Sequence, residues 1–262
     1  MIEFGTGGWR AVIGDLFTRE NIRRVACALA RRMHREGVAD KGMCIGYDRR
    51  FLSREAAIWF SEVIAGEGVV LYFVNLAAPT PQLMFTTKWM NLPYGAEVTA
   101  SHNPAVYNGI KLFTAGGRDA AQDVTDAIGA EANALSADTI QSLPFEEARA
   151  KGMIRFIDPR DAYLDSIMSQ IDMNAIRGKL AELNIQDRAQ MLGHITDSSL
   201  LDGLYTRAAV FAFPSLYDAA PMVVREAAVM GTPSVMVRGS TAAEIIRDGE
   251  NGYLCENDPQ DL

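Results

Sequence analysis

The stretch GAEVTASHNPAVYNGIKLFT, residues 95–114, decides how this sequence is interpreted. Residues 95–99 predict a buried strand, and residues 108–114 predict the strand that returns beside it. The connecting loop exposes the hydroxyl of Ser101 at a strand end, next to His102, and Lys111 lies on the returning strand. A lone serine beside a histidine is more often a turn cap than a catalytic pair. The function therefore depends on what other segments add.

Two further segments carry groups that suit a phosphate. The first, FGTGGWR at residues 4–10, is a glycine-rich turn that ends in Arg10. Its glycines permit close approach of the backbone to an anion, and an arginine adds a bidentate, charge-assisted contact. The second, GYDRR at residues 46–50, ends a predicted strand with a basic pair. Each segment alone indicates a structural turn at least as well as a binding site.

The rest of the chain alternates between strand-like and helix-like segments, which predicts an α/β fold. Thr18 predicts a helix N-cap, and apolar residues at helical spacing follow it as far as Met33. The alternation starts again near Gly178, where residues 191–195, 210–213 and 234–237 predict strands of a second, parallel sheet. We therefore expect two units.

Composition and charge limit the function classes. Apolar residues make up 48% of the chain and the net charge is −8, with an acidic excess on both sides of Gly178. An acidic chain argues against a nucleic-acid partner or an anionic membrane surface. No apolar run is long enough for a transmembrane segment. Cys27, Cys44 and Cys255 lack metal-ligand spacing, which predicts buried free thiols and a cytoplasmic location.

Residues 1–177 resemble domain I of the α-D-phosphohexomutases, the phosphoglucomutase and phosphomannomutase family. The segments that carry the resemblance occur in the family's order: FGTGGWR, FTREN, GYDRR, PTPQL, GAEVTASHNPAVYNGIKLF and the helix around Tyr163 and Leu164. The resemblance implies a three-layer α/β/α unit that acts on a hexose phosphate. It implies that Ser101 is the phosphoserine and also helps to hold Mg²⁺, that His102 supports its loop, and that Arg10 and Lys111 assist proton transfer.

Three loops of the complete mutases are absent from these 262 residues. The metal loop Asp-x-Asp-x-Asp-Arg is one of them, because no Asp-x-Asp occurs in the sequence. The sugar loop Glu-x-x-Ser-Gly-His and the phosphate loop Arg-x-Ser-Gly-Thr are the others. Phosphoryl transfer depends on positioning and on charge neutralisation by a metal. We therefore expect a phosphotransfer domain that is incomplete for turnover alone.

Residues 178–262 resemble a different class, the C-terminal half of the donor domain of GT-B glycosyltransferases of the family-4 type. This resemblance implies a partial Rossmann-like unit. Asp218 and Glu226 are eight residues apart, as are the two acids of that family's Glu-x7-Glu motif. By resemblance Glu226 contacts the ribose of a nucleotide sugar, Asp218 faces the transferred hexose, and residues 219–222 offer backbone N–H groups to the diphosphate.

Three functions remain open from the sequence. A phosphohexomutase-type phosphotransfer domain is favoured because its resemblance is longer and keeps the nucleophile. A nucleotide-sugar-dependent glycosyltransferase and a non-catalytic fusion fragment are the alternatives.

Overall fold

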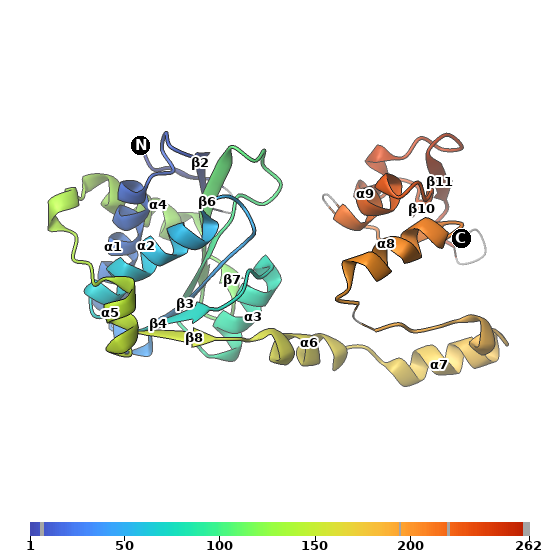
Figure 1. Cartoon of the computed structure of the whole chain (residues 1–262), viewed down its shortest axis with the longest axis horizontal. Helices are drawn as coiled ribbons and strands as arrows, with labels where there is room; N and C mark the ends of the chain where they lie inside the picture. Colours follow the sequence, from blue (N-terminus) through green and yellow to red (C-terminus); the bar gives the residue numbers. More distant parts are fainter. Residues whose placement is uncertain (6–7, 194, 219–220, 259–262) are drawn as a thin grey trace. The chain divides into compact units, whose positions relative to one another are not determined.

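The computed structural model describes residues 1–5, 8–193, 195–218 and 221–258, and it divides into two compact units, Met1–Asp172 and Met173–Leu262 (Figure 1). Each unit has its own sheet. None of the helices in the described ranges is long and apolar enough to cross a membrane.

A mixed sheet forms the centre of the first unit. Its strands follow the order β1 (Phe4–Gly5), β2 (Gly8–Val12), β6 (Tyr107–Thr114), β5 (Tyr94–Val98), β3 (Met43–Tyr47), β4 (Leu71–Val74) and β8 (Ile154–Ile157), with β7 (Arg118–Asp119) paired to β6. Strands β5, β3, β4 and β8 are parallel, whereas β6 runs antiparallel to β5 and β2. The carboxyl ends of four strands therefore share one edge of the sheet, and the loop from β5 to β6 turns at that edge.

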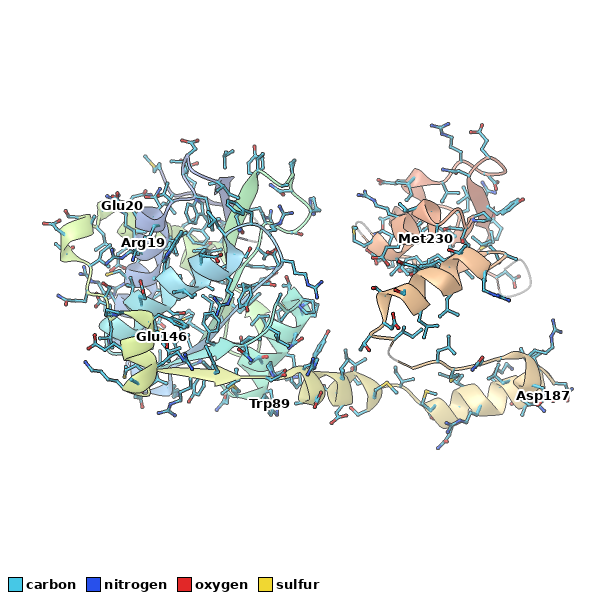
Figure 2. All side chains as sticks on the ribbon, viewed as in Figure 1. Arg19, Glu20, Trp89, Glu146, Asp187 and Met230 are labelled. Atoms are coloured by element: carbon cyan, nitrogen blue, oxygen red, sulfur yellow. The ribbon has the colours of Figure 1, made fainter. Side chains whose placement is uncertain are left out.

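Helices cover both faces of this sheet, which confirms the predicted three-layer α/β/α unit. One face carries α1 (Arg19–Arg35), α2 (Ser53–Gly66), α4 (Gln122–Ala134) and α5 (Phe145–Ala150), and the other carries α3 (Thr80–Trp89) with α6 (Arg160–Met168) packed beside it. Short 3₁₀ turns lie at Ala39–Lys41 and Ala137–Thr139. Figure 2 shows Arg19 and Glu20 at the start of α1 and Trp89 at the end of α3.

Helix α1 forms as its sequence predicts. The Thr18 hydroxyl accepts a hydrogen bond from the Asn21 backbone N–H at 3.3 Å, so it caps the first turn. Its apolar stripe, from Ile22 through Leu29 to Met33, is fully buried against the sheet and α2. Burial of each such side chain contributes about 1.5–3 kcal/mol, which outweighs the modest cost of its rotamer entropy.

The three cysteines are buried and free, as predicted. Burial raises the pKa of Cys44 to about 11, and burial together with a hydrogen bond to Glu67 raises the pKa of Cys27 to about 12. Both thiols are therefore protonated at neutral pH and serve as packing groups.

The second unit is built on a smaller, all-parallel sheet in the order β11 (Gly252–Cys255), β10 (Ser234–Val237) and β9 (Phe211–Phe213). Its helices are α7 (Met173–Glu182), α8 (Ser198–Arg207) and α9 (Met222–Val229), with 3₁₀ turns at Gln186–Arg188 and Thr241–Ile245. Val224 of α9 and Met236 of β10 are the centre of its core, together with Ala242 and Ala243.

One expected strand does not form. Residues 191–193 and 195 have no strand structure, and residue 194 lies outside the described ranges. Met191 and Leu192 are about half exposed, at 48% and 49%. An apolar run becomes a strand only where a neighbouring strand satisfies its backbone groups, and within the described chain β9 ends the sheet on one side without pairing to this segment.

Candidate functional site

Ser101 lies in the loop that follows β5, and its hydroxyl is exposed to solvent. Its backbone has φ of +55°, in the left-handed region that non-glycine residues rarely adopt. The Ser101 N–H donates to the Thr99 hydroxyl at 3.0 Å, and the Ser101 Oγ lies 3.3 Å from Nδ1 of His102. The loop therefore presents a hydroxyl beside an imidazole that can exchange a proton with it.

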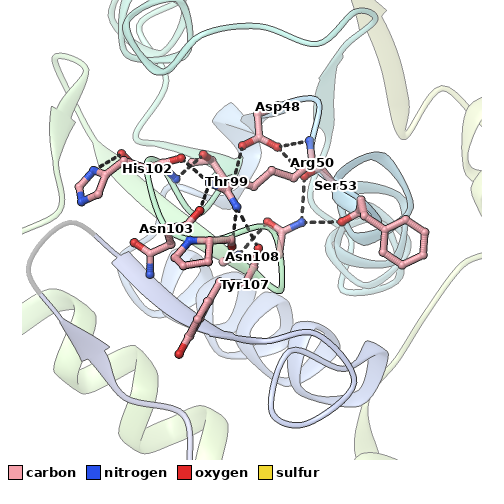
Figure 3. Close-up of polar contacts among 12 residues, drawn as sticks. Asp48, Arg50, Ser53, Thr99, His102, Asn103, Tyr107 and Asn108 are labelled. Atoms are coloured by element: carbon pink, nitrogen blue, oxygen red, sulfur yellow. Dashed lines mark hydrogen bonds and ion pairs between the residues drawn. The ribbon is translucent and has the colours of Figure 1, made fainter. Parts of the chain in front are cut away.

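Arg50 holds the serine loop from the carboxyl end of the neighbouring strand β3. Its guanidinium donates to four backbone carbonyl oxygens, those of Ser101 at 2.5 Å, Asn103 at 2.6 Å, Pro104 at 3.1 Å and Tyr107 at 3.2 Å (Figure 3). Because the five donors of a guanidinium form a rigid planar fork, they fix several acceptors at once. Arg50 therefore shapes the loop that carries Ser101.

Asp48 orients Arg50 in turn. One oxygen of its carboxylate accepts from the Arg50 backbone N–H at 2.9 Å and from the Ser53 hydroxyl at 2.6 Å. The other oxygen lies 3.4 Å from Nε of Arg50. Asp48, Arg50 and the first residue of α2 thus form one polar network, which Figure 3 shows beside the loop.

Asn108 and Gly109 at the start of β6 complete this network. The Asn108 side chain donates to Ser53 Oγ at 2.9 Å and to the Phe51 carbonyl at 3.0 Å. The Gly109 carbonyl accepts from the Thr99 N–H at 3.0 Å. A Cβ at Gly109 would collide with the carbonyl oxygens of Trp9 and Thr99, so only glycine fits between β2 and the serine loop.

Arg10 reaches the same region from β2, where it pairs with Gly109 across the strands. A Cβ built on Gly109 would lie 3.1 Å from Cγ of Arg10, which places the arginine stem beside the start of the serine loop. Within the described ranges the Arg10 guanidinium makes no hydrogen bond or ion pair, so it can accept an anion. Residues 6 and 7 of the predicted glycine-rich turn lie outside the described residues.

Lys111 lies farther along β6, with its ammonium 3.1 Å from Oδ1 of Asp119. It borders a cavity of about 330 Å³ together with Gly5 and Gly8. The structure thus brings Ser101 and His102 into contact and places Arg10 and Lys111 on strands β2 and β6. It does not join either cation to the Ser101 hydroxyl.

Glu97 is a buried carboxylate that was not among the residues predicted from the sequence to form the site. It lies on β5 opposite Lys111, is only 1% exposed, and its Oε2 has no hydrogen-bond partner in the described chain. Burial raises its pKa to about 7, and the charge of Asp48 adds to the increase, whereas Thr80 and Lys111 oppose it. The available signal was an acid in the middle of a predicted buried strand.

Mg²⁺ prefers six oxygen ligands, mostly carboxylates, phosphates and waters. The ranges that the structure describes contain no group of three or more His, Cys, Asp or Glu side chains that could hold a metal ion. Ser101, the predicted metal ligand, offers one oxygen. The donor set near Ser101 therefore does not fit a complete Mg²⁺ site.

The acids predicted in the second unit have different surroundings. Glu226 is exposed on α9, and its charge and hydrogen bond help to raise the pKa of Tyr205, although burial of the tyrosine is the larger cause. The Asp218 backbone exchanges hydrogen bonds with the Thr241 hydroxyl at 2.9 and 3.1 Å. Residues 219 and 220, which were predicted to face a diphosphate, lie outside the described residues.

Comparison with known families decides what this arrangement is. Residues 1–139 match the family model described as phosphoglucomutase/phosphomannomutase, alpha/beta/alpha domain I. The chain belongs to this family. Residues 166–262 match a second model, described as glycosyl transferases group 1, so both resemblances inferred from the sequence are confirmed. The phosphoglucomutase/phosphomannomutase match contains Arg10, Arg50, Ser101, His102 and Lys111.

Curated relatives of this family are phosphoglucomutases. The chain is 32% identical to the phosphoglucomutase of Staphylococcus haemolyticus over 127 residues, which are 47% of this chain and 23% of that protein. It is 27% identical to that of Staphylococcus saprophyticus over 193 residues, or 70% of this chain and 35% of the relative. The chain therefore spans about a quarter to a third of these phosphoglucomutases.

Solved structures of the phosphoglucomutase/phosphomannomutase family share the fold. A protein of Thermus thermophilus described as a phosphomannomutase has a TM-score of 0.55 at 25% identity, and it covers 92% of this chain and 46% of its own. The open form of the Paramecium phosphoglucomutase parafusin has a TM-score of 0.56 at 16% identity, covering 83% of this chain and 38% of its own.

Proposed function

We propose that the first unit is a phosphohexomutase-type phosphotransfer domain in which Ser101 carries the phosphoryl group of a hexose phosphate. The observation that supports this best is the conformation of Ser101. Its backbone is held in the left-handed region by the Arg50 fork, and its hydroxyl faces solvent beside His102. A strained residue that the surrounding structure over-determines is typical of a functional position.

The residues present supply the steps of the transfer. The Ser101 oxygen attacks the phosphorus of the phosphorylated sugar, and its proton passes to Nδ1 of His102 in the tautomer that leaves this nitrogen free. The bond from phosphorus to the sugar oxygen breaks, and that oxygen would take up a proton from the ammonium group of Lys111. Arg10 on β2 and Lys111 on β6 would bind the phosphoryl oxygens and assist proton transfer at the sugar oxygen.

Phosphoglucomutases generally depend on Mg²⁺, and the metal supplies neutralisation of charge on the transferring group. Because the described residues near Ser101 do not form a complete Mg²⁺ site, the role that we propose for this unit is to accept and carry the phosphoryl group. Phosphorylation of Ser101 can be measured separately from turnover. Removal of the Arg10 or Lys111 charge should slow phosphorylation of Ser101 without preventing the loop from forming.

Intact mass spectrometry of the full chain tests the proposal. After incubation with glucose 1,6-bisphosphate and Mg²⁺, the protein should gain the mass of one phosphoryl group, and peptide mapping should place it on Ser101. Ser101→Ala should gain nothing, and His102→Gln should react more slowly. A gain on another residue, or equal labelling of wild type and Ser101→Ala, would contradict the proposal.

A second candidate concerns the second unit. We infer from the match over residues 166–262 that this unit is related to nucleotide-sugar-dependent glycosyltransferases. Glu226 would then bind the ribose of the donor, and Asp218 would face the hexose. Calorimetric titration with UDP-glucose and GDP-mannose, compared with Glu226→Gln, tests whether the unit retains this binding. If neither donor binds the wild-type chain, the non-catalytic alternative holds for this unit.

A further inference from the structure

A cavity of about 420 Å³ opens at the carboxyl ends of three parallel strands of the first unit, β3, β4 and β8. Its size is within the range of small-molecule sites, about 300–1,000 Å³. Ligands of α/β sheets bind beyond the carboxyl ends of the strands, where loops and helix starts converge. None of the described residues that line this cavity belongs to the serine loop. It is therefore a separate place on the sheet edge.

Hydrogen bonds between the strand ends hold the backbone next to this cavity, at Tyr47 and beside Val74 and Ala77. The Ala78 N–H donates to the Tyr47 carbonyl at 3.0 Å, and the Asn75 N–H donates to the Ile157 carbonyl at 3.0 Å. The Tyr47 hydroxyl donates to the Asn75 carbonyl at 3.0 Å. Because these groups are already satisfied, the backbone beside the cavity does not have to rearrange when a ligand enters.

Two polar side chains on the cavity wall lack partners within the described chain. Gln82, in the first turn of α3, is only 7% exposed, and its side-chain amide makes no hydrogen bond there. Arg49, which follows β3, is exposed and makes neither an ion pair nor a hydrogen bond. The Gln82 amide is not one of the fully buried polar groups without a partner, so its free donor and acceptor atoms reach the solvent of the cavity, where a ligand can bind them.

The charge of the cavity favours an anion. Arg160 lines the wall next to Asp158, and the two side chains form an ion pair at 3.2 Å. Arg160 also lies 3.7 Å from Asp161, which is outside the cavity lining. Among the side chains that line the cavity, Asp158 balances Arg160, and Arg49 adds a positive charge without a counterion in the described chain. An arginine fork matches the oxygens of a phosphate in geometry and charge. Leu76, which is 52% exposed, provides an apolar wall on another side.

We propose that this cavity binds a sugar phosphate at a site distinct from Ser101, with the phosphate on Arg49 and a sugar hydroxyl on the amide of Gln82. The amide has both donors and an acceptor, as a sugar hydroxyl requires, and Leu76 covers the C–H face of the ring. The proposal does not require that Ser101 be phosphorylated.

Titration of the ¹⁵N-labelled full chain at low ionic strength tests this site. The probes are glucose 6-phosphate, inorganic phosphate and glucose, and the readout is the Gln82 side-chain amide resonance, identified by its loss in Gln82→Leu. Glucose 6-phosphate should shift this resonance in wild type and in Ser101→Ala, with inorganic phosphate binding more weakly and glucose more weakly still. Arg49→Gln should weaken binding of both phosphates roughly tenfold to a hundredfold.

Arg54→Gln is the matched control, because Arg54 is an exposed arginine near the start of α2 that lines none of the described cavities. It should keep wild-type affinity. The proposal is overturned if the Gln82 resonance does not respond, or if Arg49→Gln and Arg54→Gln bind glucose 6-phosphate equally well. Equal affinity for inorganic phosphate and glucose 6-phosphate would overturn the sugar contact. Loss of the response in Ser101→Ala would assign the binding to the serine loop instead.

Discussion

Nη2 of Arg50 lies 2.5 Å from the backbone carbonyl oxygen of Ser101. The carbonyl of the proposed phosphate carrier therefore points back at the end of β3 while its hydroxyl points to solvent. This contact crosses 51 residues of sequence, and it joins the conformation of the serine loop to a side chain that does not itself need to touch the substrate.

Arg50→Lys should lower the rate of Ser101 phosphorylation by at least about tenfold, although the charge is kept. A lysine ammonium cannot span four carbonyl oxygens in one plane, so part of the loop would lose its donors. Each lost charge-assisted hydrogen bond costs about 1.5–3 kcal/mol in the region it holds. Phosphorylation by glucose 1,6-bisphosphate, followed by mass spectrometry, measures the effect. Arg54→Lys is the control, and an equal rate in both variants would show that the fork is dispensable.

Ser101→Gly should be more stable than Ser101→Ala by about 1 kcal/mol, although both lack the hydroxyl. Alanine at φ of +55° keeps the left-handed strain of the native serine, whereas glycine adopts this conformation without a Cβ clash. The larger entropy of glycine in the unfolded chain offsets part of this gain. Urea denaturation of the two variants at one pH measures the difference. If Ser101→Ala is the more stable variant, the loop does not hold a left-handed residue.

Glu97 should make the protein less stable as the pH rises from about 4.5 to about 7. Its pKa is raised from 4.5 to about 7 by burial, so the folded state keeps a proton that the unfolded state releases. The favourable contribution is complete below the unfolded pKa and is lost as the pH passes the folded pKa. From the size of the shift the loss is roughly 3 kcal/mol.

Glu97→Gln removes this titration and imitates the protonated acid. The free energy of unfolding of the variant, relative to wild type, should increase between pH 4.5 and 7 and then level off. Urea denaturation over a pH series measures the two curves. Glu55→Gln, at an exposed position on α2, should run parallel to wild type. If the Glu97→Gln and wild-type curves are parallel, the pKa of Glu97 is the same in the folded and unfolded states, and burial does not raise it.

Trypsin should cleave the native chain first between residues 170 and 190. Helix α7 has no buried residue and carries the exposed Arg177 and Lys179, and Arg188 is exposed in the 3₁₀ turn that follows it. A helix of this length without tertiary packing is marginal in water, so its bonds open readily for a protease. Arg32 of α1, within the larger core, should resist. Timed digestion with fragment masses measures the order, and initial cleavage within α1 would contradict it. The proposed boundary at residues 177 and 178 stays a prediction.

Helices and strands that depend on neighbouring residues of the chain could be predicted from the sequence. Thr18 and the apolar spacing after it predict α1, because a cap and a buried stripe involve residues only a few positions apart. The stretch from Gly95 to Thr114 predicts the strand, loop and returning strand in the same way, since each part is specified by its own residues. Ser101 was identifiable as the candidate phosphate carrier because the segments around it resemble those of the phosphohexomutases, whereas its place at a strand end alone favoured a turn cap.

The partners of these residues were decided only by the tertiary structure. The strand order places β3 beside β5, which brings Arg50 under the serine loop and Asp48 near Glu97. Residues 191–193 and 195 show the opposite case, because these residues of a predicted strand have no neighbouring strand and lie outside the sheet. The sequence by itself thus determined the fold class and the candidate phosphate carrier. The clamp on its loop and the protonation of the buried acid depend on neighbours that are distant in the chain, because burial and hydrogen bonding act through space.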